Sequence, residues 1–204
     1  MTQKTKTIIA IILFIIFIVV IAVSYQLLKN EEEEKKLSQL EQRKNQVENI
    51  STEQIGNQTT SSSQKNQQKY IDFTVENELG EMVSLSQYIG KPIVINYWAT
   101  WCAYCIEEMP YFNKMFEKEK ENITFFMINA TDGVRETKEK AKNYVQKSNY
   151  QFPIFYDTNY SARNNYYIDG YPTTIFIDKE GNLFDIYYGA ISEKTLTKYM
   201  NLLK

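Results

Sequence analysis

The chain has 204 residues, a net charge of -2, and 43% hydrophobic and 14% aromatic residues. This composition supports one sizeable core and argues against a nucleic-acid partner, which would require a basic surface. Because the chain contains no histidine, mechanisms that use an imidazole as base, nucleophile or metal ligand are excluded.

The N-terminal region has the pattern of a membrane anchor. Residues 1–7 are polar and include two lysines but no acid, whereas residues 8–23 are apolar without interruption and weaker apolar character continues to residue 28. As a helix, residues 8–28 would span roughly 30 Å, about one hydrocarbon core. Since positive flanks stay cytoplasmic, we expect a single-pass transmembrane signal anchor at 8–28, in contact with the lipid bilayer, with the cytoplasmic N-terminus at 1–7. A cleaved signal peptide is the alternative, because residues 22–24 resemble a small-x-small cleavage site.

Residues 29–69 differ in composition from residues 70–204. They are charged at first and then rich in Gln, Asn, Ser and Thr, with no aromatic residue before Tyr70. Such a stretch cannot bury enough apolar surface to order itself. We therefore predict a flexible extracytoplasmic linker at 29–69 and a folded domain at 70–204.

The folded domain alternates strand and helix patterns. Residues 93–98 form a near-continuous apolar run, as expected for a strand buried on both faces. The alternation predicts an α/β domain with a mixed sheet. Strands are expected at 71–75 and 82–85, as a hairpin around Gly80, and at 93–98, 123–129, 154–156, 173–177 and 183–188; helices are expected at 103–120, 135–148, 161–167 and from Ser192, a candidate N-cap.

The cysteines, Cys102 and Cys105, lie where the strand at 93–98 gives way to a helix. Unpaired N–H groups and the helix dipole favour thiolate over thiol at a helix N-terminus, and thiolate is the attacking form in disulfide exchange. We assign Cys102 as the nucleophile and Cys105, about one helical turn along, as the resolving thiol.

Other interpretations of this pair are weaker. A structural disulfide would close a very short loop, and stabilisation by a cross-link rises with loop length. A zinc site would need a second half from another chain. A peroxidase would require Thr where Ala99 stands, and a c-type haem site would require His in place of Ile106. We therefore expect no metal and no cofactor.

Several motifs together resemble one family. The run from Ile93 to Cys105, Glu107-Glu108-Met109-Pro110, Gly170-Tyr171-Pro172-Thr173-Thr174 and residues 177–181 strongly resemble thioredoxin-like proteins of the TlpA/ResA type. The resemblance covers roughly residues 70–203. It implies a thioredoxin fold, with a central mixed β-sheet flanked by helices, an N-terminal β-hairpin and an inserted βα element. Family members are typically membrane-tethered and extracytoplasmic.

Glu108 is a candidate for proton transfer. It lies three residues after Cys105, so a helix would place both on one face. Its carboxylate could accept the Cys105 proton and raise the pKa values of the thiols by like-charge repulsion. The resemblance also assigns the matching acid a functional role; the alternative is a surface acid favoured by the helix dipole. Asn96 stands where ordinary thioredoxins carry a buried acid.

The resemblance also indicates a substrate-binding surface. It implies a cis peptide between Tyr171 and Pro172, placed against the cysteine pair, where it leaves edge groups free to dock an extended substrate. Trp101 is expected at the apolar rim beside the reactive sulfur, whereas Trp98 is expected in the core.

These observations predict an enzyme, a thiol–disulfide oxidoreductase acting on exported proteins with cysteine or oxidised-methionine chemistry. Tyr104, between the cysteines, offers no positive charge to stabilise a thiolate, so we favour the reducing direction. The resemblance implies a membrane thiol–disulfide electron carrier as donor, and apocytochrome c or a methionine sulfoxide reductase as substrate. A disulfide-forming oxidase and a tethered peptide-binding module remain the alternatives.

Overall fold

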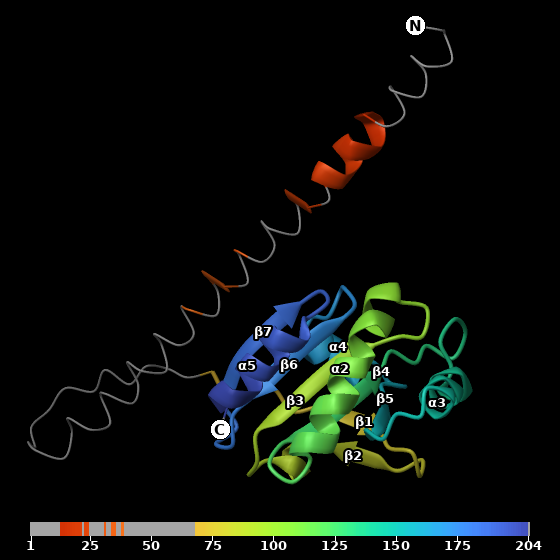
Figure 1. Cartoon of the computed structure of the whole chain (residues 1–204). Coiled ribbons are helices and arrows are strands. Elements are labelled where there is room, and N and C mark those ends of the chain that lie inside the picture. The colour runs from red at the N-terminus through yellow and green to blue at the C-terminus, as the bar shows by residue number, and fades with distance from the viewer. Residues whose placement is uncertain are drawn as a thin grey trace, which may run out of the picture. The chain divides into compact units, whose positions relative to one another are not determined.

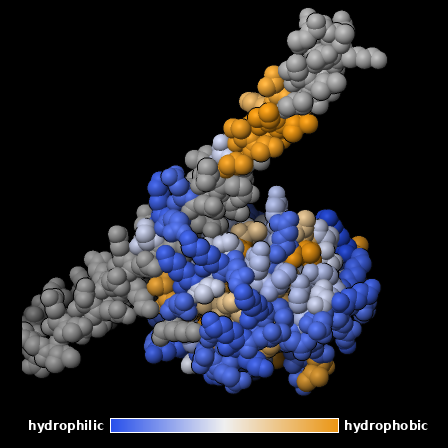
Figure 2. All heavy atoms as spheres, in the orientation of Figure 1, coloured by the Kyte–Doolittle hydropathy of each residue, from blue (hydrophilic) through white to orange (hydrophobic). Residues whose placement is uncertain are grey.

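The computed structural model describes residues 13–21, 23–24, 31, 34–35, 38 and 68–203. Residues 13–21 and 23–24 are helical, and the apolar side chains of residues 13–21 and 23 are exposed (Figure 2). Within the described part of the chain, no helix combines the length and the hydropathy needed to cross a membrane. The predicted N-terminus at 1–7, much of the predicted anchor at 8–28 and nearly all of the predicted linker at 29–69 lie outside the described residues.

The domain is built on a mixed seven-stranded sheet of order β2-β1-β5-β4-β3-β6-β7 (Figure 1). Every residue of the central strand β3 is buried, and β3 pairs parallel with β4 and antiparallel with β6. This is the predicted thioredoxin-type arrangement, with the hairpin of β1 and β2 extending the sheet at one edge. The strands are β1 Thr74–Glu76, β2 Met82–Ser84, β3 Ile93–Trp98, β4 Thr124–Asn129, β5 Ile154–Tyr156, β6 Thr173–Ile177 and β7 Leu183–Tyr188.

The helices cover both faces of this sheet. Asn96 of β3 contacts the helix α2 through Glu108, whereas the next residue, Tyr97, bonds to Asp157 just before α4, so α2 and α4 lie on opposite faces. Figure 1 places α5 beside α2. The helices are α2 Ala103–Glu119, α3 Lys138–Lys147, α4 Ser161–Asn165 and α5 Glu193–Leu203, with a 3-10 turn, η2, at Leu85–Tyr88.

Local hydrogen bonds set the element boundaries. The Ser192 hydroxyl accepts from the Thr195 N–H at 3.2 Å, which confirms the predicted cap of α5. The helix α3 begins at Lys138, three residues later than predicted, because the Thr137 hydroxyl caps it by accepting from the Lys140 N–H at 3.3 Å. Residues 130–137 therefore form a loop rather than a first helical turn.

The chain enters the sheet slightly ahead of Tyr70. Lys69 forms a bridge with Asn182, the Tyr70 N–H donates to the Gly181 carbonyl at 3.0 Å, and the Leu183 N–H donates to the Gln68 carbonyl at 2.7 Å. The start of the domain is thus hydrogen-bonded to the turn between β6 and β7.

Candidate active site

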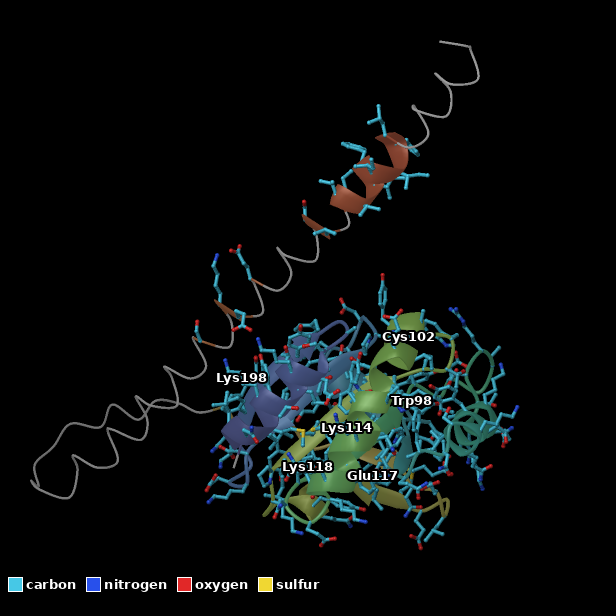
Figure 3. All side chains as sticks on the ribbon, in the orientation of Figure 1. Trp98, Cys102, Lys114, Glu117, Lys118 and Lys198 are labelled. Atoms are coloured by element: carbon cyan, nitrogen blue, oxygen red, sulfur yellow. A yellow bond between two sulfur atoms is a disulfide. The ribbon has the colours of Figure 1, made fainter. Side chains whose placement is uncertain are left out.

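The two cysteines form a disulfide at the start of α2, with 5.2 Å between their Cα atoms. Figure 3 places Cys102 at one end of α2, with Lys114 and Lys118 further along the helix. Cys102 is the N-cap residue, and its sulfur accepts from the Cys105 N–H at 3.2 Å. Cys102 retains slight exposure, whereas Cys105 is fully buried. A thiolate formed at Cys102 would therefore be the reachable one, and it would face the positive end of the helix dipole.

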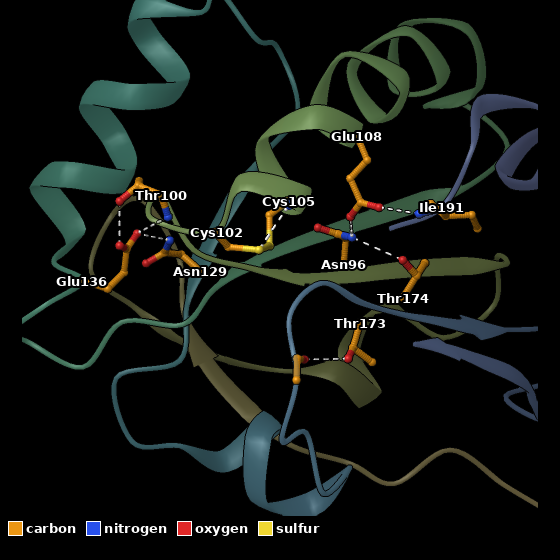
Figure 4. Close-up of a disulfide and its surroundings, with 11 residues drawn as sticks. Asn96, Thr100, Cys102, Cys105, Glu108, Asn129, Glu136, Thr173, Thr174 and Ile191 are labelled. Atoms are coloured by element: carbon orange, nitrogen blue, oxygen red, sulfur yellow. Dashed lines mark hydrogen bonds between the residues drawn. A yellow bond between two sulfur atoms is a disulfide. The ribbon is translucent and has the colours of Figure 1, made fainter. Parts of the chain in front are cut away.

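Glu108, one turn after Cys105, is buried within the domain (Figure 4). Its Oε1 accepts from the Asn96 side-chain amide at 2.7 Å, and its Oε2 accepts from the Ile191 N–H at 2.8 Å. The alternative interpretation of Glu108 as an exposed surface acid is therefore wrong. A buried carboxylate held by directed hydrogen bonds on the face of Cys105 has one fixed orientation.

Asn96 joins this carboxylate to the sheet. Its amide nitrogen also donates to the hydroxyl of Thr174 at 3.2 Å. Thr174 lies two residues after Pro172. Its Oδ1 atom is buried without a hydrogen-bond partner among the described residues. Asn96 thus connects α2 with β6 at the position where ordinary thioredoxins carry an acid.

The residues predicted to bind substrate come together beside the disulfide. The Tyr171–Pro172 peptide is cis, as the resemblance implies. The Tyr171 ring meets the Trp101 ring edge to face, with centroids 5.4 Å apart, and stacks on Tyr97 at 5.6 Å. Trp101 is 41% exposed, whereas Trp98 is fully buried. Trp101 and Tyr171 form an aromatic wall next to Cys102.

A second buried carboxylate escaped the sequence analysis. Glu136 lies in the loop before α3, and its Oε1 accepts from the Thr100 N–H at 3.0 Å and from the Asn129 side-chain amide at 2.7 Å. Its Oε2 accepts from the Thr100 hydroxyl at 2.7 Å. Because Thr100 is two residues before Cys102, Glu136 fixes the backbone segment that leads into the redox pair. The signal that could have found it is Thr137, a candidate N-cap that leaves Glu136 in the preceding loop.

Residues 66–186 match the AhpC/TSA family. The chain belongs to the AhpC/TSA family. It is 30% identical to the thiol-disulfide oxidoreductase ResA of Bacillus subtilis over 134 residues, which cover 65% of this chain and 73% of ResA.

Solved structures of similar proteins share the fold. The structure titled MTB dsbF is 27% identical, with a TM-score of 0.57, and the match covers 65% of this chain and 95% of that one. The exposed lipoprotein thioredoxin Etrx1 of Streptococcus pneumoniae is 25% identical with a TM-score of 0.56, and the match covers 65% and 98% of the two chains. This AhpC/TSA protein is therefore a thiol–disulfide oxidoreductase with a thioredoxin fold.

The cysteine pair lies within the residues that match the AhpC/TSA family. Ala99, fully buried, occupies the position where a peroxidase would require Thr. Among the described residues, no cluster of three or more acidic or cysteine side chains has the arrangement of a metal site.

Proposed function

We propose that the protein is a reductant of disulfides in exported proteins, with Cys102 as nucleophile and Cys105 as resolving thiol. The buried Glu108 carboxylate, held on the Cys105 face of α2 by Asn96 and Ile191, carries this proposal. A negative charge beside a thiol pair disfavours the thiolate, and a strongly oxidising pair is one whose reduced form is stabilised. The surroundings of Cys105 therefore favour electron donation.

The reaction proceeds in two exchanges. The Cys102 thiolate attacks one sulfur of a substrate disulfide, so that a mixed disulfide forms and one substrate thiolate leaves. Cys105 then loses its proton to Glu108 and attacks the Cys102 sulfur, which closes the protein disulfide and releases the second substrate thiolate. The substrate gains two electrons, the cysteine pair loses two, and Glu108 passes its proton on to a departing thiolate.

The proposed location is the outer side of the cell membrane, with residues 8–28 as a single-pass anchor in the lipid bilayer. The apolar run and the lysines before it support this topology. Since each turnover leaves the pair oxidised, a membrane thiol–disulfide carrier must reduce it again. Apocytochrome c and a methionine sulfoxide reductase are the substrates we propose, since each requires thiols outside the cytoplasm.

The potential of the pair tests the direction. The full chain is equilibrated with glutathione and dithiothreitol redox buffers, and the fraction of free Cys102 and Cys105 is measured by alkylation. We expect a value near the thioredoxin potential of about -270 mV. A value near about -120 mV would instead establish the alternative, an oxidase that installs disulfides.

The topology can be tested with the same cysteines, because the chain has no others. A membrane-impermeant maleimide should label the reduced pair in intact cells as fully as in permeabilised cells. The matched control is Cys102→Ser/Cys105→Ser, which should not be labelled. Labelling that requires permeabilisation would place the domain on the cytoplasmic side.

The aromatic wall of Trp101 and Tyr171 keeps a second function in view, a tethered module that binds extended peptides. Cys102→Ser separates the two functions. Loss of both disulfide exchange and peptide binding in this variant supports the enzyme. Peptide binding that survives the loss of exchange supports the module.

A further inference from the structure

One cation lies at the rim of the redox pair. The guanidinium carbon of Arg135 lies 3.8 Å from the centroid of the Trp101 ring, within the range of a cation–π interaction. Trp101 directly precedes Cys102 and is partly exposed. Arg135 comes from the loop before α3, 30 residues further along the chain than Cys105, so the fold, and not the local sequence, brings this charge to the site.

The backbone around Arg135 is fixed on both sides. The Asp132 carboxylate accepts from the Val134 N–H at 2.7 Å and from the Glu136 N–H at 2.9 Å. Glu136 is in turn bound to Thr100. The loop is thus tied internally and to the segment that leads into the cysteines, and this holds the arginine over the indole.

The charge of Arg135 is available to an incoming molecule. Arg135 is exposed, and within the described residues no carboxylate lies within ion-pair distance of its guanidinium. The nearest acids along the chain are engaged elsewhere: Asp132 with the backbone N–H groups of its own loop, which lower its pKa, and Glu136 with Thr100 and Asn129.

We propose that Arg135 is a specificity-determining residue, which favours disulfide substrates that carry negative charge beside the reacting sulfur. The inference rests on thiol–disulfide exchange at Cys102 and names the substrate class of that site. A guanidinium held over the Trp101 ring attracts carboxylates that flank the target disulfide and can bind them through two N–H groups. Cationic disulfides approach the same rim against repulsion.

Two small disulfides of opposite charge test this inference. The reduced full chain, in neutral detergent at low salt, is mixed with oxidised glutathione, which is anionic, or with cystamine, which is cationic. In each reaction the protein dithiol becomes a disulfide and the probe becomes two thiols. We expect Arg135→Gln to slow the reaction with glutathione and to speed that with cystamine, each about threefold, so that the ratio of rate constants falls about tenfold. About 1 M salt should weaken the wild-type preference, because the screening length falls to about 3 Å.

Two control variants separate charge from packing. Arg135→Lys keeps the charge and should retain most of the preference. Lys91→Gln removes an exposed positive charge just before β3, whereas the cysteines follow the other end of that strand, so it should leave the ratio unchanged.

Equal slowing of both probes in Arg135→Gln would show that Arg135 only supports Trp101 and would overturn the inference. If the wild type reacts with neither probe, exchange at this pair fails, and the inference fails with it.

Discussion

Two buried carboxylates, Glu108 and Glu136, are held in nearly the same way on either side of the disulfide (Figure 4). Each accepts at 2.7 Å from the side-chain amide of an asparagine in a central strand, Asn96 of β3 or Asn129 of β4. Each also accepts from one backbone N–H, that of Ile191 or of Thr100. The two acids share these kinds of donor, and Glu136 also accepts from the Thr100 hydroxyl. We expect the difference in role to come from the element that carries each acid.

Glu108 projects from the helix that carries Cys105, whereas Glu136 projects from a separate loop and ties down the segment before Cys102. A change at Glu108 therefore acts on the proton that Cys105 must lose. A change at Glu136 acts on the position of the backbone and on the folding free energy. The comparison predicts slower resolution of the mixed disulfide for a change at Glu108 alone. A loss of folding free energy is expected at both positions, because each carboxylate is the acceptor of buried N–H donors.

Replacement of the resolving thiol should slow turnover more than any other change proposed below. Cys105→Ser should stop turnover and accumulate a mixed disulfide on Cys102, because nothing remains to attack that bond. Mass spectrometry after acid quenching measures the adduct. The matched variant Cys102→Ser should form none; an adduct on Cys105 in that variant would reverse the assignment of the two thiols.

Glu108→Gln should come next in size. Gln keeps the shape but cannot take the Cys105 proton, so release of the second substrate thiol should slow by about 10²-fold at pH 7, in the range of a lost general base. Stopped-flow measurement of decay of the mixed disulfide tests this. Thiolate absorbance near 240 nm should rise at lower pH than in the wild type, since a like charge has been removed. An unchanged decay rate and an unchanged thiolate titration together would remove Glu108 from the mechanism.

Glu136→Ala should lower the free energy of unfolding without slowing resolution of the mixed disulfide. The truncated side chain leaves the Thr100 N–H and the Asn129 side-chain amide without their acceptor, at a cost of about 2 kcal/mol. Urea unfolding with the disulfide intact measures this loss. Decay of the mixed disulfide should stay within about threefold of the wild-type rate. A stable variant with slow resolution would erase the distinction between the two acids.

The sequence predicts one of these acids and misses the other for a physical reason. The spacing of Glu108 from Cys105 lies within one helix, so periodicity alone places both on one face. Its burial depends on Asn96 and Ile191, which are distant in sequence, and periodicity cannot establish such contacts. The fold was predictable because it also leaves a local pattern in the sequence: the apolar run of β3 leads directly into the cysteines.

Glu136 and Arg135 have no comparable local pattern. The sequence predicts a helix from residue 135, in which both would occupy a solvated first turn. The Thr137 cap instead shortens the helix, and the freed loop reaches across to Thr100 and Trp101. These contacts join segments more than 30 residues apart, so only the tertiary structure reveals them.

A third buried carboxylate, Asp157, provides the reference for a purely structural hydrogen bond and the smallest expected effect. Its Oδ2 accepts from the Tyr97 hydroxyl at 2.8 Å, on the face of β3 away from α2. Tyr97→Phe should cost about 1 kcal/mol at pH 8, the typical net value of one hydrogen bond, and should leave exchange kinetics unchanged.

The pH dependence of this cost has a definite sign. Burial, reinforced by Asp157, raises the pKa of Tyr97 well above its ordinary value of about 10. The stabilisation from Tyr97 is therefore complete below pH 10 and is lost as the pH rises, because the unfolded chain ionises first. At pH 11 the wild type should have lost about 1.4 kcal/mol that Tyr97→Phe cannot lose.

Burial also raises the pKa of Tyr166, to about 12, but that contribution is common to both proteins and cancels. Urea unfolding at pH 8 and pH 11 should therefore show the cost of Tyr97→Phe vanish or change sign; a constant difference would mean that the Tyr97 hydroxyl is not buried against Asp157.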